Sequence, residues 1–202
     1  GTLGRAFLAL RPPGHHATRT RAMGFCLLNN AALAAHHLLA LGLARRPVIV
    51  DFDVHHGNGT QAIFETDPRV VFVSIHEAGN YPGTGWPHET GTGEGTGTTF
   101  NRPFPPATPP GEIVAEMRHV LHEVRERFAP DFVLVSAGFD GHRLDPLGNW
   151  LLEAEHFAAI TREITALAGA TAGGRVLSVL EGGYDLEGLA EGAEAHVLSL
   201  AE

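Results

Sequence analysis

The chain has 202 residues, of which 44% are hydrophobic, so it is long enough to bury the core of one domain, which we expect over residues 1–202. Its formal net charge of -9 excludes the basic surface of a nucleic-acid-binding protein and favours a cationic partner, such as a polyamine or a lysine-rich tail. The single cysteine excludes an internal disulfide, and without an apolar run of about 18 residues we expect a cytoplasmic protein that spans no membrane.

Short apolar segments alternate with helical patterns along the chain, which is typical of a parallel α/β sheet. The apolar segments are nearly continuous, as in strands that are buried on both faces. In chain order we expect a strand over Arg5–Leu10, a helix over Asn29–Leu41, strands over Val48–Phe52 and Val70–Ile75, a long loop over 78–110, a helix from Ile113 to Phe128, a strand over Phe132–Ala137, a helix from Phe157 to Leu167 and a strand over Val176–Leu180. A loop of that length inside a domain is usually functional.

Unusual polar residues follow three of the expected strands directly. Asp53 and His55 follow one strand, Asp140 follows another, and Glu181–Tyr184 follow a third. The carboxyl ends of parallel strands meet at one edge of a sheet, and open α/β sheets bind their ligands there. The sequence therefore predicts that residues far apart along the chain converge on one site.

Asp53 and His55 stand two positions apart and project to the same side, where a carboxylate and an imidazole suit zinc. Asp140 is the best candidate for a third ligand, and three protein ligands leave the open position that a catalytic zinc requires. For an isolated pair of this kind, helix capping and surface hydrogen bonds are an equally good explanation. The agreement of three strand ends favours the metal site.

His15 and His16 follow a Pro-Pro-Gly turn, whose backbone is stiff. One imidazole can take a proton from a water at the metal while its neighbour stabilises the developing charge. Tyr184 follows two glycines that allow close approach of the backbone to a ligand, and its phenol can donate to an oxyanion. Taken singly, an ordinary surface loop and an ordinary turn explain these two segments as well.

Together these segments resemble the histone deacetylase family, particularly its class II-like and bacterial deacetylase branch with the acetylpolyamine amidohydrolases. The matching segments, in the family's order, are RPPGHHA, GFCLLNNAA, VIVDFDVHHGNGTQAIF, VSIHE, YPGTG, GTGEGTGTTFNRPFPP, SAGFDGHRLDPLGNW and LEGGYDL. The resemblance implies an arginase/deacetylase-like three-layer α/β fold with a mainly parallel sheet. Family members usually carry a further portion before RPPGHHA, so we expect a fragment that lacks its N-terminal part. A protein that is naturally this short would expose an apolar sheet edge.

The resemblance also implies roles for individual residues. It places zinc on Asp53, His55 and Asp140, in agreement with the spacing argument. His16 matches the family's general base and acid, and His15 matches its electrostatic partner. Tyr184 matches the tyrosine that polarises the amide carbonyl.

Two further positions match residues that support the histidines. Asp51 matches the carboxylate that orients His15. Asn58 stands where another branch of the family has an aspartate facing His16, and this asparagine should leave His16 less basic. The family's structural potassium ion would lie, mostly on main-chain oxygens, at Asp51, Asp53, His55, Ser74 and Ile75.

The resemblance implies a narrow channel that accepts an acetyl-lysine side chain. Phe25 and Tyr81 match its walls, and Gly24, Leu147 and Gly183 would lie near them. Apolar walls suit an alkyl stem and an uncharged acetamide, and they would reject a charged lysine. Ordinary core or loop packing is the alternative role for the two aromatic residues.

Two histidines beside these motifs have no assigned chemistry. His76 ends an expected strand, and we expect a hydrogen-bonded structural residue there rather than a fourth ligand. His142 lies two residues after Asp140, and we expect it at the rim of the site.

The implied activity is zinc-dependent hydrolysis of an acetyl amide to a free amine and acetate. Acetyl-lysine in a protein, an acetylated polyamine and an acetoin-related metabolite all suit the same core as substrates. The alternatives are a catalytically incompetent fragment, a module that only binds acetylated ligands, and a two-manganese ureohydrolase, which would need additional bridging carboxylates. Family members that prefer small substrates often dimerise, so a homo-oligomer is also among the expectations.

Overall fold

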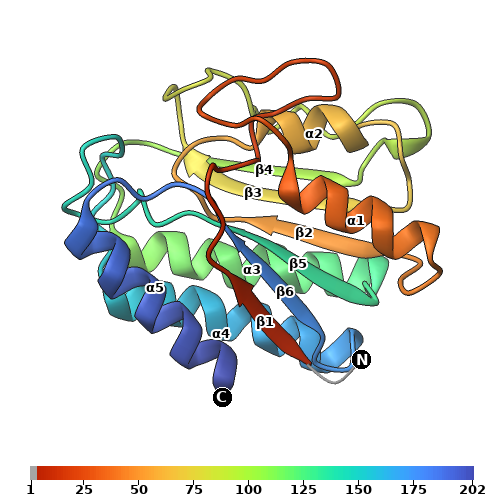
Figure 1. The fold of residues 1–202 in the computed structure, drawn as a ribbon. Helices are drawn as coiled ribbons and strands as arrows, with labels where there is room; N and C mark the ends of the chain where they lie inside the picture. The colour runs from red at the N-terminus through yellow and green to blue at the C-terminus, as the bar shows by residue number, and fades with distance from the viewer. Residues whose placement is uncertain (1–3) are drawn as a thin grey trace.

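A six-stranded parallel sheet forms the middle layer of the structure, a computed structural model that describes residues 4–202 (Figure 1). The strands are β1 (Arg5–Leu8), β2 (Pro47–Asp51), β3 (Val71–Glu77), β4 (Thr99–Phe104), β5 (Phe132–Ala137) and β6 (Val176–Leu180). The helices are α1 (Asn30–Ala40), α2 (Asn58–Phe64), α3 (Pro110–Phe128), α4 (Ala154–Thr171) and α5 (Leu186–Ala201). Helices α1 and α2 cover one face of the sheet, and α3, α4 and α5 cover the other. This is the predicted three-layer α/β architecture.

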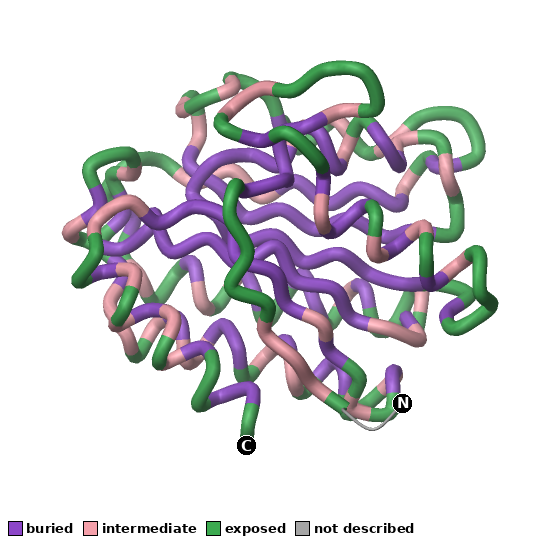
Figure 2. The backbone as a smooth tube through the Cα atoms, viewed as in Figure 1, coloured by how far each residue is buried: buried purple, intermediate pink, exposed green. Residues whose placement is uncertain are grey.

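The two faces of the sheet bury separate apolar clusters, and Figure 2 shows the central strands buried along nearly their whole length. On the larger face, the predicted helical stripes of α3 and α4 supply Met117, Val120 and Ile164, all of them fully buried. On the other face, Ala35 of α1 packs with Ile49 of β2. Burial on both faces explains why β2 and β5 are apolar without interruption.

The order of the strands places the predicted site at a topological switch point. The sheet runs β1-β6-β5-β2-β3-β4, so β2 leads to β3 on one side while β5 leads to β6 on the other. The strands that precede Asp53, Asp140 and Tyr184 are therefore the neighbours β2, β5 and β6. Ligands bind in the crevice at such a reversal, outside the carboxyl ends of the strands.

The strand β1 forms one edge of the sheet. It pairs with β6 only, and Leu8 and Leu10 are 40% and 37% exposed. The expected strand over Arg5–Leu10 is therefore two residues too long, because the backbone N–H of Leu10 turns back to the carbonyl of Leu8. The strands over Phe132–Ala137 and Val176–Leu180 are confirmed with their bounds.

One strand and two α-helices escaped prediction. The expected loop over 78–110 contains β4, whose sequence Thr-Phe-Asn-Arg-Pro-Phe is polar and includes a proline because the strand lies at the other edge. The short α2 begins after Gly57 and contains Gly59, and the glycine-containing α5 lacks a clear apolar stripe. Across residues 4–202, no helix has the length and apolar character needed to cross a membrane.

The burial of α4 against the sheet predicts the stability of one variant. Replacing the fully buried Ile164 with Ala should lower the free energy of unfolding by about 2–5 kcal/mol, because it removes apolar contacts and leaves a cavity. Chemical denaturation monitored by circular dichroism measures the change. The exposed Arg162→Ala variant on the same helix should change stability by about 0.5 kcal/mol or less. Equal effects of both substitutions would contradict the assigned core.

Candidate active site

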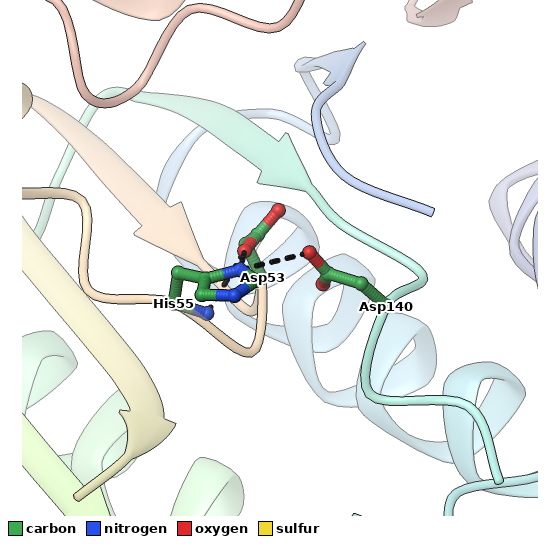
Figure 3. A group of neighbouring side chains, drawn as sticks. All are labelled: Asp53, His55 and Asp140. Atoms are coloured by element: carbon green, nitrogen blue, oxygen red, sulfur yellow. Dashed lines mark hydrogen bonds and ion pairs between the residues drawn. The ribbon is translucent and has the colours of Figure 1, made fainter. Parts of the chain in front are cut away.

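The side chains of Asp53, His55 and Asp140 converge beyond the ends of β2 and β5 (Figure 3). One ligand atom from each lies within 4.8 Å of the others, and all three residues are buried. The Nδ1 atom of His55 is 3.0 Å from Oδ1 of Asp53 and 3.0 Å from Oδ2 of Asp140. The residues that the sequence predicted as metal ligands are thus brought together.

The second oxygen of each carboxylate is held by the backbone. The N–H of Gly182 donates to Oδ2 of Asp53 at 2.8 Å, and the N–H of Val54 donates to Oδ1 of Asp140 at 3.0 Å. Each carboxylate therefore presents its remaining oxygen to His55. Two anionic oxygens and one imidazole nitrogen, buried and fixed in this way, fit a divalent cation such as zinc.

The electrostatics of these three side chains also favour a bound cation. Burial and the nearby charge of Asp53 raise the pKa of Asp140 to about 7. Burial opposes the charged form of His55, yet its hydrogen bonds to Asp140 and Asp53 raise its pKa to about 11. Two carboxylates this close share the positive charge of one imidazole, and a divalent cation would neutralise both.

The histidine pair lies on the turn before α1, with its ring centroids 4.0 Å apart. His15 Nδ1 is 3.0 Å from Oδ2 of Asp51, and His16 Nδ1 is 2.8 Å from Oδ1 of Asn58. Both contacts join the partners that the family resemblance implied. The two rings therefore have different surroundings, one facing a buried carboxylate and the other a neutral amide.

This difference separates the basicity of the two imidazoles. Burial opposes protonation of His15, but the carboxylates of Asp53 and Asp51 overcome it and raise its pKa to about 10. Burial and the positive charge on His15 lower the pKa of His16 to about 3. A neutral His16 beside a cationic His15 can accept a proton at its free Nε2, because Nδ1 already faces Asn58.

A cleft of about 540 Å³ opens above these histidines. It is lined by His16, Gly24, Phe25, His55, Asn80, Tyr81, Leu147 and Tyr184. Of the expected channel residues, Gly183 alone is not part of the lining. Asn80 was missed by the sequence reasoning, although it directly precedes Tyr81, and its side-chain amide donates to the carbonyl of Leu147 at 3.2 Å.

The aromatic wall at Phe25 is built by a tight turn. Met23 and Cys26 exchange backbone hydrogen bonds, and the two residues between them, Gly24 and Phe25, have positive φ values of 55° and 64°. This is the pattern of a two-residue type I′ turn, in which a bulky side chain at positive φ is strained. The turn holds the Phe25 ring 69% exposed at the cleft, with its centroid 5.8 Å from that of Tyr184.

Tyr184 is suited to donate a hydrogen bond rather than to ionise. Burial, together with the charges of Asp53 and Asp140, raises the pKa of its phenol above the ordinary value. The backbone N–H of Tyr184 donates to Oδ2 of Asp145 at 2.6 Å, which fixes the start of the segment after β6. The hydroxyl therefore stays protonated on a braced backbone beside His16 and His55.

Glu181 is the second residue of this site that the sequence reasoning left without a role. Its carboxylate is fully buried and accepts from the backbone N–H of Gly14 and of His15. The signal in the sequence was its place at the end of β6, three residues before Tyr184. It joins the two segments that carry the histidines and the tyrosine.

Other polar residues near the site have structural partners. Asp51 and Ser74, expected near a potassium ion, are buried register partners on β2 and β3. His76 lies 2.9 Å from the Ser74 hydroxyl and 3.0 Å from the Gly85 carbonyl, which confirms a hydrogen-bonded structural residue. The expectation that His142 lines the rim is wrong, because α5 covers its ring.

The His142 side chain is fully buried and stacks on the ring of Phe157, with Glu191 of α5 3.2 Å from its Nε2.

Burial raises the pKa of the Cys26 thiol to about 12, so this cysteine stays protonated and is a poor nucleophile.

The close packing of Gly182 against the acidic residues predicts a metal-binding defect. A Cβ at position 182 would overlap Oδ2 of Asp140 and lie 2.6 Å from Oδ2 of Asp53. Gly182→Ala should therefore weaken zinc binding by about tenfold or more, as measured by competition with a chelating dye. The matched variant Gly169→Ala, on α4 with no atom within 4 Å of the new methyl, should bind zinc as the wild type does. Equal affinities for all three proteins would contradict the assigned ligands.

Comparison with known proteins identifies relatives of this chain. The family model of the histone deacetylase domain matches residues 1–200. Histone deacetylase 14 of Arabidopsis thaliana, a chloroplastic protein, is 46% identical over 187 residues, which is 91% of this chain and 43% of that protein. A probable deacetylase of Archaeoglobus fulgidus is 45% identical over 183 residues, or 91% of this chain and 51% of the relative.

A crystal structure of acetylpolyamine aminohydrolase from Burkholderia pseudomallei has a TM-score of 0.91 and 37% sequence identity, covering 99% of this chain and 57% of that one. The chain thus spans about half the length of the relatives it matches. The sheet and its covering helices are those of the arginase/deacetylase fold, and the chain belongs to the histone deacetylase family.

Proposed function

We propose that this chain forms the catalytic core of a zinc-dependent deacetylase, which hydrolyses an acetyl amide to a free amine and acetate. The observation that carries the proposal is the convergence of Asp53, His55 and Asp140 beside a cleft lined by His16 and Tyr184. Metal ligands, a base and an oxyanion donor are the groups that hydrolysis of an unactivated amide requires.

Asp53, His55 and Asp140 would hold the zinc ion. When bound, zinc supplies Lewis-acid activation of the amide carbonyl and of the attacking water. The described residues contain one such group of three ligands, whereas a two-manganese ureohydrolase would need bridging carboxylates for a second metal. Potassium is part of the proposal as a structural ion near Asp51 and Ser74, where a hard cation would take oxygen ligands.

His16 serves as the general base and then as the general acid. Its Nδ1 faces the Asn58 oxygen, which leaves Nε2 to take a proton from water and to return it to the departing amine. His15, held by Asp51, keeps its positive charge and stabilises the negative charge that develops next to it. Burial and the charge of His15 keep His16 weakly basic, and the neutral Asn58 raises its pKa less than a carboxylate would, so the proton is readily passed on.

Tyr184 donates its phenolic hydrogen to the oxyanion of the tetrahedral intermediate. Its raised pKa keeps this hydrogen in place at neutral pH. Because Asp145 braces the backbone of Tyr184, the donor is held in position before the substrate arrives.

The cleft walls suit an acetylated amine on an alkyl stem. Phe25, Tyr81 and Leu147 offer apolar surface, and an uncharged acetamide enters such surroundings at much lower cost than an ammonium group does. With a net charge of -9, the protein favours substrates that are otherwise cationic, such as an acetylpolyamine or an acetylated lysine-rich tail. A cytoplasmic location and a homo-oligomeric state stay predictions.

Acetate release is the direct test of this proposal. Zinc-loaded protein should release acetate from an acetyl-lysine peptide and from an acetylpolyamine assayed in parallel, and the faster substrate indicates the preferred class. Release should stop when a chelator removes the metal and return when zinc is added back, because the metal activates both reactants. Folded, zinc-bound protein that binds an acetylated ligand without releasing acetate would identify a binding module instead.

The assigned oxyanion donor gives a second prediction. Tyr184→Phe should lower kcat by about a hundredfold or more, because the variant loses one hydrogen bond to the oxyanion. Zinc content and melting temperature should match those of the wild type, since the phenolic oxygen is not a metal ligand. A turnover rate near the wild-type value in this variant would remove Tyr184 from the mechanism.

A further inference from the structure

We propose that Glu181 is a positioning residue, which fixes the turn that carries His15 and His16 against the segment that carries Tyr184. The inference rests on the proposed function, because it concerns the relative placement of the base and the oxyanion donor. Glu181 is neither one of the proposed metal ligands nor one of the residues that line the cleft.

The contacts of Glu181 define this role. Its Oε2 accepts from the backbone N–H of Gly14 at 2.6 Å and from that of His15 at 3.0 Å. Its Oε1 accepts from the Ser136 hydroxyl on β5 at 3.1 Å. The side chain is fully buried, so these hydrogen bonds are shielded from bulk solvent. All of these contacts go to the histidine turn or to the sheet, so the Glu181 carboxylate fixes the backbone of the turn relative to β5 and β6.

A second contact joins the same two segments from the outside. The guanidinium of Arg11 donates to the carbonyl of Gly183 at 2.6 Å and lies 5.6 Å from the centroid of the Tyr184 ring. Residues 11–15 and 181–184 are therefore connected at both ends, by one buried connection and one partly buried connection. The separation along the chain is 166 residues or more, so no local backbone constraint could set this distance.

The geometry matters because both groups act on the same substrate atoms. A displacement of about 1 Å in a catalytic group can lower the rate by a hundredfold. The backbone N–H groups that Glu181 holds belong to Gly14 and His15, so Glu181 also sets the positions of the His15 and His16 side chains. Substitution of Glu181 should thus lower kcat while KM, which depends on the cleft walls, changes little.

The test compares two variants of Glu181 in the whole protein. Glu181→Ala removes the acceptors and should lower kcat about tenfold or more with KM changed less than about twofold. Glu181→Gln keeps a carbonyl oxygen for the two N–H groups, and its amide can donate to the Ser136 hydroxyl, so its kcat should stay within about threefold of the wild type. If the glutamine variant loses as much as the alanine variant, the charge of Glu181 matters rather than its hydrogen bonds, and the proposal is wrong.

A matched control variant separates positioning from general stability. Asp131 also holds two consecutive backbone N–H groups, those of Arg45 and Arg46 at 2.8 and 2.9 Å, at the opposite ends of the strands. Asp131→Ala should lower the melting temperature without changing kcat. If Asp131→Ala and Glu181→Ala lower kcat equally, Glu181 has only a structural role.

Amide hydrogen exchange provides a readout that does not depend on activity. Peptides that cover residues 11–17 should lose protection in Glu181→Ala and keep it in Glu181→Gln. Should Glu181→Ala fail to fold, the exposed Arg11→Gln variant tests the outer connection and should lower kcat severalfold with little change in KM. Unchanged kcat in every folded variant, beside an active wild type, overturns this inference alone; an inactive wild type overturns the proposed function as well.

Discussion

Two buried carboxylates at the junction of β2 and β5 impose the main constraint on this structure. Asp53 and Asp140 are 1% and 0% exposed, and isolated charges so placed would be strongly destabilising. Hydrogen bonds stabilise both groups. A backbone N–H donates to one oxygen of each carboxylate, and the His55 ring lies between the two remaining oxygens. Because those N–H groups come from the segments after β2 and β6, the centre requires three neighbouring strands in register. A bound cation would complete this arrangement.

The same acidic centre accounts for the unequal histidines. His15 faces carboxylates on two sides and gains positive charge, and that charge then disfavours protonation of His16 next to it. One imidazole thus becomes a fixed charge and its neighbour a neutral proton acceptor. Two adjacent residues of the same type acquire distinct properties solely from their surroundings.

Much of the fold and most of the site could be predicted from the sequence because the signals were local. Continuous apolar strands marked the middle of the sheet, and the residues directly after them marked the site. The family resemblance assigned partners such as Asn58 and channel walls such as Phe25. Glu181 and Asn80 stand next to residues that the sequence singled out, but their roles could not be predicted because their partners lie in distant segments. β4 was missed because an edge strand tolerates proline and polar residues, and the rim position expected for His142 was wrong because α5 could not be foreseen.

The walls and the floor of the cleft come from different kinds of structure. At the floor, His55 and Tyr184 follow the ends of β2 and β6, whose register is set by the sheet, whereas Phe25, Tyr81 and Leu147 lie on three separate loops. A loop can change in length or composition while the strands keep their pairing. The entrance of the cleft can therefore change shape without disturbing the buried acidic centre. In such a protein, the shape of the cleft entrance can evolve through changes in the surface loops, while the residues at the strand ends stay the same.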